Sequence, residues 1–260
     1  MEWAYGITTV PERFHDTLPR TIASLRGAGF ARPRLFIDGA GPQTVQWYED
    51  EYGLPISARN PRIGLAANWC LSAVELYLYA PMADRYVVFQ DDVIACLSLR
   101  RYLESSPFPT RGYLNLFTFL DNDQLVSSRR VGWSEAAELV TRDSQVFHGK
   151  RQQTGRGALA LVFDRPGLTA LFGQPHLINR PQSGRAGAVK IDGGIVESMN
   201  RAGYREYVHN PSLVAHTGHH STKAGARWHK NAKTFPGESF NALSFLDDAA
   251  ISGRCLQHPS

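Results

Sequence analysis

The sequence has few cysteines, no long apolar run and no repeated segment, and each absence excludes a class of protein. Its cysteines, Cys70, Cys96 and Cys255, are far apart and form no C-x-x-C pair. That spacing argues against a disulfide framework and a cysteine-ligated zinc site, and it fits a reducing cytoplasm. No run of about 18 apolar residues occurs, so no membrane span is predicted. The N-terminus has no basic region followed by an apolar one, which argues against a signal peptide.

Length and charge bound the organisation of the chain. The 260 residues are 43% hydrophobic and carry a net charge of +4, which predicts one large domain at 1–234 followed by a C-terminal tail at 235–260 that packs on it or extends from it. The sequence pI of about 9.0 favours anionic ligands such as sugar nucleotides or nucleic acid. The alternative is that the basic residues are solvated surface. We expect a cytoplasmic protein, in the host cytoplasm if the chain is viral, and we infer no obligate protein partner.

Strand-like and helix-like patterns alternate along the chain. This alternation predicts an α/β fold whose mostly parallel central sheet is flanked by helices, with irregular insertions that face the ligand. Residues 121–155 are polar without a dominant period and are predicted to be irregular. The predicted strands are 3–10, 34–39, 85–89, 112–119, 157–163, 204–208 and 212–215, and the predicted helices are 17–26, 43–52, 64–79, 93–103, 166–172 and one that starts at 191.

The most informative stretch runs from Arg85 to Val93. Arg85 is followed by four β-branched or aromatic residues, which predict a buried strand, and then by Gln90, Asp91 and Asp92. Ligands of open α/β sheets bind at the carboxyl ends of strands, and carboxylates there hold a divalent cation or act as an acid or base. A third interpretation is that Asp92 caps the helix predicted from Val93.

Further polar residues follow other predicted elements. Asp38 ends the second strand, and Asn60, Gly64 and Asn68 are spaced by four residues around the start of a helix, where an anion is favoured near Arg59 and Arg62. The alternative there is a loop before an ordinary helix.

Histidines and one acid near the C-terminal half are also candidates. His216, His219 and His220 follow a short strand, so they suit a cation site, a zinc site or a structural role. Asp192 stands at a predicted helix start, where it is either an N-cap or a general base.

These motifs together resemble the GT-A glycosyltransferases, over about residues 3–222. They appear in the family's order as Thr8-Thr9-Val10-Pro11-Glu12-Arg13, Asp38, the Asn60/Gly64/Asn68 helix entry, Phe89-Gln90-Asp91-Asp92-Val93 and Pro211-Ser212-Leu213-Val214-Ala215-His216-Thr217-Gly218. The last of them, with Ser221-Thr222, is similar to the type IV branching N-acetylglucosaminyltransferases.

The resemblance implies a Rossmann-like GT-A fold and a nucleotide-sugar donor, expected to be a UDP-sugar, with Mn²⁺ or Mg²⁺ on its diphosphate. It assigns the metal to Asp92 and His216 and makes Asp192 the catalytic base of an inverting displacement. Gln90 departs from the family's acidic motif, since an amide stands at its first acid. The donor-binding residues that the resemblance implies are Thr8, Thr9, Arg13, Asp38, Asn60, Gly64, Asn68, Gln90 and Asp91.

The basic segment after His216 is expected either to fold over the diphosphate or to be a solvated loop; it contains Lys223, Arg227 and Lys230. Arginine-rich segments favour an anionic acceptor. One hypothesis is a hydroxymethylated pyrimidine in DNA, and the alternative is a glycan or a small molecule. A sugar-nucleotide nucleotidyltransferase and a non-catalytic carbohydrate- or nucleic-acid-binding module are the hypotheses of other classes.

Overall fold

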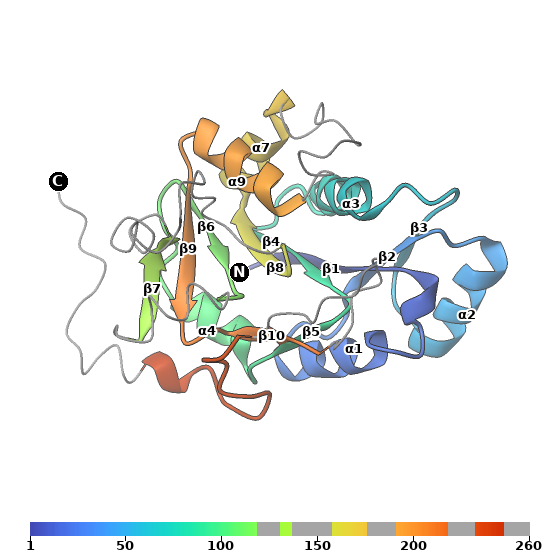
Figure 1. The fold of residues 1–260 in the computed structure, drawn as a ribbon, viewed down its shortest axis with the longest axis horizontal. Helices are drawn as coiled ribbons and strands as arrows, with labels where there is room; N and C mark the ends of the chain where they lie inside the picture. Colours follow the sequence, from blue (N-terminus) through green and yellow to red (C-terminus); the bar gives the residue numbers. More distant parts are fainter. Residues whose placement is uncertain (119–130, 137–157, 176–190, 218–231, 247–260) are drawn as a thin grey trace, which may run out of the picture.

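The computed structural model describes residues 1–118, 131–136, 158–175, 191–217 and 232–246, without the side chains of 191–193 (Figure 1). Its strands are β1 (Trp3–Thr9), β2 (Arg34–Asp38), β3 (Ile56–Arg59), β4 (Arg85–Gln90), β5 (Val93–Ala95), β6 (Gly112–Asn115), β7 (Gly132–Glu135), β8 (Ala160–Asp164), β9 (Arg205–Asn210) and β10 (Val214–His216). The helices are η1 (Pro11–Arg13), α1 (Leu18–Gly27), α2 (Pro42–Tyr52), α3 (Leu65–Tyr79), α4 (Leu99–Ser105), α7 (Arg165–Phe172) and α9 (Ile191–Arg201).

An eight-stranded sheet in the order β3-β2-β1-β4-β8-β6-β9-β7 forms the centre of the fold. All of its strands except β8 and β7 point the same way, because β8 is antiparallel to both neighbours and β7 is antiparallel to β9. The predicted fold class, an α/β fold with a mostly parallel central sheet flanked by helices, is confirmed. The carboxyl ends of β1, β2 and β4 therefore lie at one edge of the sheet.

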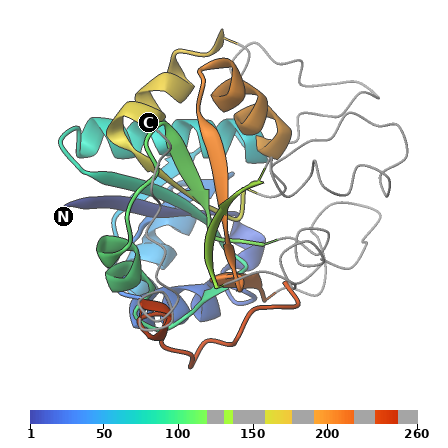
Figure 2. The same ribbon diagram turned by 90° about the vertical axis from the view of Figure 1, so that its left-hand side faces the viewer.

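Helices cover both faces of the sheet (Figures 1 and 2). On one face α3, α7 and α9 bury apolar side chains such as Trp69, Leu168 and Met199 in a single cluster. On the other face α1 and α4 pack with the short β5–β10 ribbon, and residues 232–246 add Ala242 and Phe245 to that second cluster.

The helix predicted over 93–103 is wrong in its first part. Val93–Ala95 is strand β5, which pairs antiparallel with β10 so that Val93 lies opposite His216. The helix α4 begins only at Leu99, after Ser98 takes a left-handed φ of 58°. The branched side chains of Val93 and Ile94 favour a strand once β10 supplies a partner. Since no helix starts at Val93, Asp92 does not cap one.

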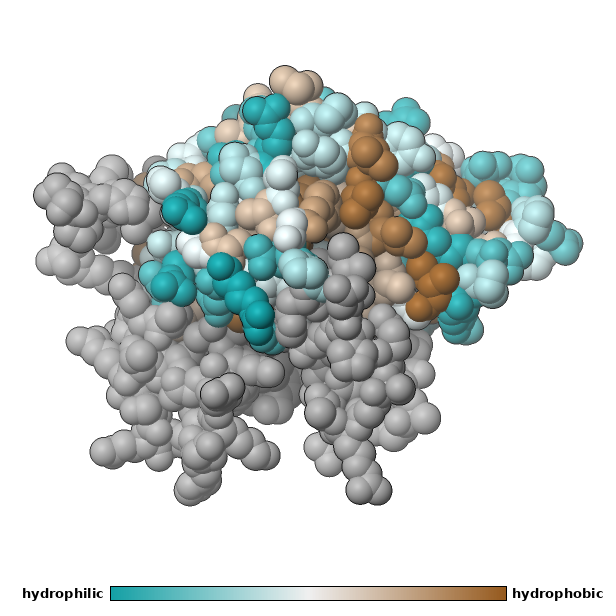
Figure 3. Space-filling model, turned by 90° about the horizontal axis from the view of Figure 1, so that it is seen from above, coloured by the Kyte–Doolittle hydropathy of each residue, from teal (hydrophilic) through white to brown (hydrophobic). Residues whose placement is uncertain are grey.

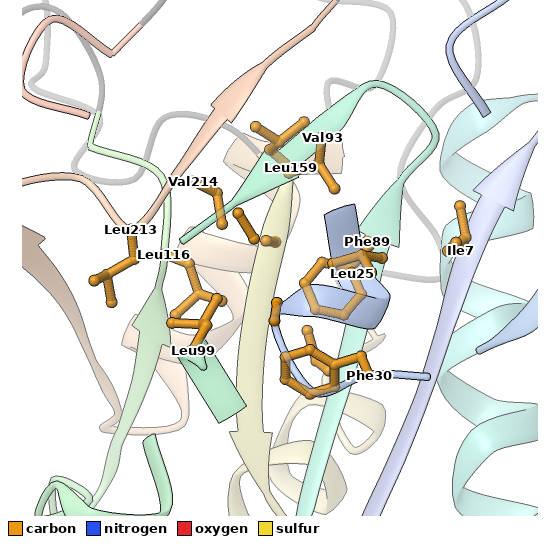
Figure 4. Packing of buried hydrophobic residues seen from close by; sticks show 14 of the residues in the cluster. Ile7, Leu25, Phe30, Phe89, Val93, Leu99, Leu116, Leu159, Leu213 and Val214 are labelled. Carbon is orange, nitrogen blue, oxygen red and sulfur yellow. The ribbon is translucent and has the colours of Figure 1, made fainter. Parts of the chain in front are cut away.

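The β5–β10 ribbon is held by buried apolar side chains. Val93 and Val214 are fully buried. Figure 4 shows them over the same core as Leu116, Leu159 and Leu25. This packing fixes the backbone on both sides of the turn that carries Asp91 and Asp92, so the positions of these carboxylates are set by the core.

A second correction concerns the segment predicted to be irregular. Most of it lies outside the described residues, but Gly132–Glu135 forms β7, which pairs antiparallel with β9 at the edge of the sheet. Its sequence, GWSE, has no strand signature of its own. The backbone of β9 supplies the pairing that the local pattern does not predict.

Candidate functional site

The candidate site lies where three parallel strands end. The β1 residue Thr8 pairs with Gln90 of β4, and Thr9 of β1 pairs with Ile37 of β2, one residue before Asp38. Thr9, Asp38 and the turn after Gln90 therefore meet at the same edge of the sheet, as predicted from the ends of the three strands.

Asp91 is held from the neighbouring strand and from helix α1. The hydroxyl of Thr9 donates to Oδ2 of Asp91 at 2.8 Å, and the hydroxyl of Thr21 donates to the Asp91 carbonyl at 2.9 Å. The pKa of Asp91 is raised to about 7, first by burial and second by the neighbouring Asp92 carboxylate, against the opposing effects of Thr9 and Arg13. Two carboxylates thus share a poorly solvated turn, where a nearby positive charge stabilises their ionised forms.

Asp92 and His216 come together from different parts of the chain. Oδ2 of Asp92 lies 3.4 Å from Nδ1 of His216, and their side chains are only 6% and 14% exposed. The backbone N–H of Thr217 donates to the Asp92 carbonyl at 2.7 Å, and the ring of Phe117 packs edge-on against the imidazole at 5.1 Å. The two side chains predicted to bind the metal are therefore adjacent and positioned by buried neighbours.

Asp38 has a definite local role at the start of α3. Its Oδ1 accepts from the N–H of Ile63 at 2.8 Å and its Oδ2 accepts from the N–H of Gly64 at 2.9 Å. Gly64 has a φ of +91°, a left-handed conformation that favours glycine, and it directly precedes the helix. Asp38 thus ties the end of β2 to the entry of α3.

The loops on the two sides of this helix entry are also joined to each other. A guanidinium nitrogen of Arg62 lies 2.8 Å from Oε2 of Glu12 in η1. Arg62 passes so close to Gly39 that a side chain on that glycine would collide with it, since an added Cβ would lie 2.7 Å from the Arg62 Nε. The loop after β1 and the loop before α3 therefore face one another.

The remaining predicted donor residues differ in their surroundings. Thr8 is buried and its hydroxyl donates to the Phe89 carbonyl. The amide of Asn68 is buried, and its Nδ2 donates to the Phe36 carbonyl at 3.0 Å. Arg13 is buried and pairs with Asp16. Asn60 is exposed after β3, and Gln90 is partly buried at the end of β4. The structure brings together one group of predicted residues: Thr9, Arg13, Asp91, Asp92 and His216. Asp38 and Gly64 make up a second group.

The other predicted residues are described only in part or not at all. The backbone of Asp192 lies in the first turn of α9, one residue after the helix begins at Ile191, so it is not at the N-cap position. The side chain of Asp192 is not described. The residues predicted for a lid and for zinc or anion binding are outside the described residues; they are Lys223, Arg227, Lys230, His219 and His220.

Residues that the sequence did not single out complete the site. Tyr48 on α2 donates its hydroxyl to the Val10 carbonyl at 3.2 Å, beside Thr9. Thr21, Phe117 and Thr217 support Asp91, His216 and Asp92 as described above. No local pattern distinguishes these residues, because each reaches the site only through the long-range pairing of the sheet.

The donor set around Asp92 fits a hard or borderline divalent cation. Among the described residues no group of three or more His, Cys, Asp or Glu side chains is placed to bind a metal. A carboxylate oxygen and an imidazole nitrogen suit Mn²⁺ or Mg²⁺ when phosphate oxygens and water supply the other ligands. Two protein ligands at a strand end are therefore compatible with a cation that arrives with a phosphorylated ligand.

No described helix is long and apolar enough to cross a membrane.

No protein-family model and no curated protein sequence matches this chain. Among solved structures it is similar to GalNAc-T7 crystallised with UDP, GalNAc and Mn²⁺, with a TM-score of 0.49 and 11% identity over 96% of this chain and 48% of that one. The chain thus spans about half the length of that protein.

Two nucleotidyltransferase structures are also similar. One is a cytidylyltransferase from Leptospira borgpetersenii serovar Hardjo-bovis, with a TM-score of 0.44 and 12% identity over 99% of this chain and 100% of that one. The other is a putative glucose-1-phosphate thymidylyltransferase from Bacillus anthracis in complex with a sucrose, with a TM-score of 0.40 and 12% identity over 98% of both chains. Similarities of this size assign no activity, so function has to be inferred from the residues of this chain.

Proposed function

We propose that this chain is a divalent-metal-dependent glycosyltransferase that moves a sugar from a nucleotide-sugar donor, a UDP-sugar, to an acceptor hydroxyl. One observation carries the proposal: Asp92 and His216 lie 3.4 Å apart, directly after the strand that ends in Gln90. A buried carboxylate and an imidazole at the ligand-binding edge of an α/β sheet suit a cation that neutralises a diphosphate.

Asp92 and His216 would hold Mn²⁺ or Mg²⁺, which stabilises the negative charge that grows on the leaving diphosphate. Asp91, fixed by Thr9, would orient water or the ribose beside the cation. Gln90 would offer hydrogen bonds without adding charge, since it is an amide. The polypeptide thereby supplies two ligands and leaves the other coordination positions to the donor.

The nucleoside end of the donor would lie between the loop after β1 and the entry of α3. The Asp38 carboxylate fixes the backbone of Ile63 and Gly64, and the first turn of α3 presents N–H groups that favour an anion. Arg13 is buried in the loop after β1, near Asp91. These positions support binding of a phosphorylated ligand along the edge of the sheet.

The proposed chemistry is a single displacement. The acceptor oxygen forms a bond to the anomeric carbon while the bond from that carbon to the diphosphate oxygen breaks, which inverts the configuration. The proton of the acceptor hydroxyl passes to a carboxylate, and Asp192 in the first turn of α9 is the candidate. The products are the glycosylated acceptor and the nucleoside diphosphate.

The test is release of UDP from a panel of UDP-sugars in the presence of Mn²⁺, with and without EDTA. We expect release of UDP in the presence of Mn²⁺, loss of that release when EDTA is added, and its recovery when excess Mn²⁺ is restored. Asp192→Asn should keep donor binding and lose transfer, and unchanged transfer would remove Asp192 as the base. No release with any nucleotide sugar, together with intact sugar or nucleic-acid binding, would instead favour a binding module.

The nucleotidyltransferase alternative has a distinct expectation. Enzymes that make sugar nucleotides usually carry a glycine- and lysine-rich phosphate loop after the first strand. In this chain that place is Val10 followed by the η1 turn from Pro11 to Arg13, without glycine. Formation of a sugar nucleotide and pyrophosphate from a nucleoside triphosphate and a sugar phosphate would favour this alternative.

The acceptor remains a prediction from the sequence. The arginine-rich segments that suggested DNA with hydroxymethylated pyrimidines lie at 127–130, 150–156 and 179–185, outside the described residues. A gel shift on modified duplex DNA at low salt tests it, and no binding would remove DNA in favour of a glycan or a small molecule.

A further inference from the structure

Helix α3 carries a second apolar face, away from the sheet. Its inner face, with Trp69, Ser72 and Leu76, is buried. On the outer face Leu71 is 44% exposed and Leu78 is 68% exposed. Figure 3 looks down on the side of the molecule that α3 covers and shows hydrophobic residues gathered there in a stripe. Contiguous apolar stripes are uncommon on the exposed surface of a protein, and they often mark a site of interaction with a partner.

The spacing of this face specifies a helical partner. Ala67, Leu71, Val74 and Leu78, which we call the α3 seam, are separated by four, three and four residues. This is the spacing of the contact positions in a two-helix coiled coil, where each side chain inserts between residues of the facing helix. The helix has 15 residues, about 22 Å, so the seam runs along most of its length. Tyr79 and Met82, 61% and 70% exposed, adjoin one end of the seam. There the guanidinium of Arg34 lies 4.0 Å from the centre of the Tyr79 ring, and that of Arg165 contacts the Met82 sulfur.

Charge on α3 favours a partner whose own contact face is neutral. The helix has one charged residue, Glu75, and its carboxylate lies 2.7 Å from a guanidinium nitrogen of Arg59 on β3. A charged partner helix would therefore find no charge of opposite sign along the seam. A second copy of the same seam meets this condition, because no like charges face each other across the two-fold axis.

The seam is also complementary to itself when the two helices run antiparallel. With the two-fold axis midway between Leu71 and Val74, each Leu78 lies opposite the partner's Ala67, and each Leu71 lies opposite the partner's Val74. Large side chains then face smaller ones at every position, which is how well-packed helix pairs fill space. We propose that this protein forms a homodimer through antiparallel packing of the α3 seams.

The first experiment is sedimentation equilibrium of the full chain over a wide concentration range. The wild type should be a dimer in reversible exchange with monomer. Leu71→Asp and Leu78→Asp should each raise the dimer dissociation constant by about 100-fold or more, because each buries an unpaired charge. The matched control is Leu65→Asp: Leu65 is 43% exposed on the same helix, about 120° around it from Leu71, and this change should leave the dissociation constant unchanged.

The second experiment tests the antiparallel register and does not depend on loss of binding alone. Ala67→Lys and Leu78→Glu should each be monomeric when purified separately. An equimolar mixture should form a heterodimer, because lysine at 67 in one chain then faces glutamate at 78 in the other. A monomeric wild type, a wild-type dimer that both aspartate variants preserve, or a mixture that stays monomeric would each overturn the proposal.

Discussion

The hydroxyl of Thr9 at the end of β1 donates to Oδ2 of Asp91, 2.8 Å away in the turn after β4. The contact joins two adjacent parallel strands at the edge where the candidate site lies. It places a neutral donor on one of two adjacent carboxylates and leaves Asp92 to face His216. The different neighbours of the Asp91 and Asp92 carboxylates therefore follow from the strand order and not from the local sequence alone.

Thr9→Val removes this hydrogen bond while keeping the shape of the side chain. The bond lowers the pKa of Asp91 against the larger effects that raise it to about 7, so it stabilises the ionised form. We expect the free energy of unfolding to fall by about 2 kcal/mol at pH 8 and by less at pH 6. Urea denaturation at both pH values measures this. Thr169→Val on α7, where the hydroxyl donates to the Arg165 carbonyl, is the control, and an equal loss at both pH values would contradict the assignment.

Asp38→Ala should loosen the entry of α3 without unfolding the sheet. Both carboxylate oxygens of Asp38 accept backbone N–H groups, from Ile63 and Gly64. Hydrogen exchange at those two amides should accelerate by about 10-fold or more, since each bond to a charged acceptor contributes about 1.5–3 kcal/mol.

A nucleotide panel separates two roles for Asp38. If it positions the helix entry, Asp38→Ala weakens binding of UDP, CDP and GDP by the same factor. If it reads the base, the preference among the three changes. Asp50→Ala on α2, where the carboxylate accepts from the Gln46 side chain, should alter neither exchange nor nucleotide binding.

His209 should make stability depend on pH. Its ring is fully buried, its Nδ1 lies 2.6 Å from the Pro211 carbonyl and its Nε2 lies 2.7 Å from the Tyr102 hydroxyl. Trp133 and Phe245 pack on the ring, and Tyr102 is the titratable group that contacts it. Because a carbonyl only accepts, the proton is on Nδ1 and Nε2 accepts from Tyr102. Burial lowers the pKa of His209 to about 4 from its usual 6.5.

Between pH 6.5 and 4 the unfolded chain therefore binds a proton that the folded chain does not. The contribution of His209 to stability falls as the pH falls through this window, by about 3 kcal/mol in total. Asp91, with a pKa raised to about 7, has the opposite dependence over part of the same range, so the difference between variants is the quantity to measure. The stability difference between wild type and His209→Gln should shrink as the pH is lowered. A constant difference for His209→Gln would contradict the buried neutral ring.

Gly6→Ala tests the packing of the central sheet. An added Cβ on Gly6 in β1 would collide with the ring of Phe36 and would lie 2.7 Å from the Arg34 carbonyl oxygen. Backbone cannot move aside as a surface side chain does, so we expect a loss of about 3 kcal/mol in the free energy of unfolding. Gly173→Ala, where the nearest atom is 3.5 Å away, should change it little. If Gly6→Ala left the free energy of unfolding unchanged, β1 and β2 would be less closely packed than described here.

The sequence predicted the carboxyl ends of the central strands better than the elements that pack around them. The strands predicted to end at residues 10, 39 and 89 end at Thr9, Asp38 and Gln90, one residue away in each case. They were predictable because buried strands have continuous apolar runs. The helix expected from Val93 was wrong because its start is a strand whose partner, β10, lies more than a hundred residues away. The contacts of Thr21 with Asp91 and of Phe117 with His216 could not be predicted either. They are made by tertiary packing, which no local sequence period encodes.

The proposed activity requires that Asp92 and His216 bind a divalent cation together with a nucleoside diphosphate. Electron paramagnetic resonance titration of Mn²⁺ in the presence of UDP tests it most directly. The control is Asp84→Asn, at the opposite end of the same strand, where the carboxylate accepts from the N–H of Glu2. We expect UDP-dependent Mn²⁺ binding by the wild type and by Asp84→Asn, and binding weaker by about 100-fold or more in Asp92→Asn and in His216→Ala. Equal Mn²⁺ affinity in wild type and Asp92→Asn would contradict it.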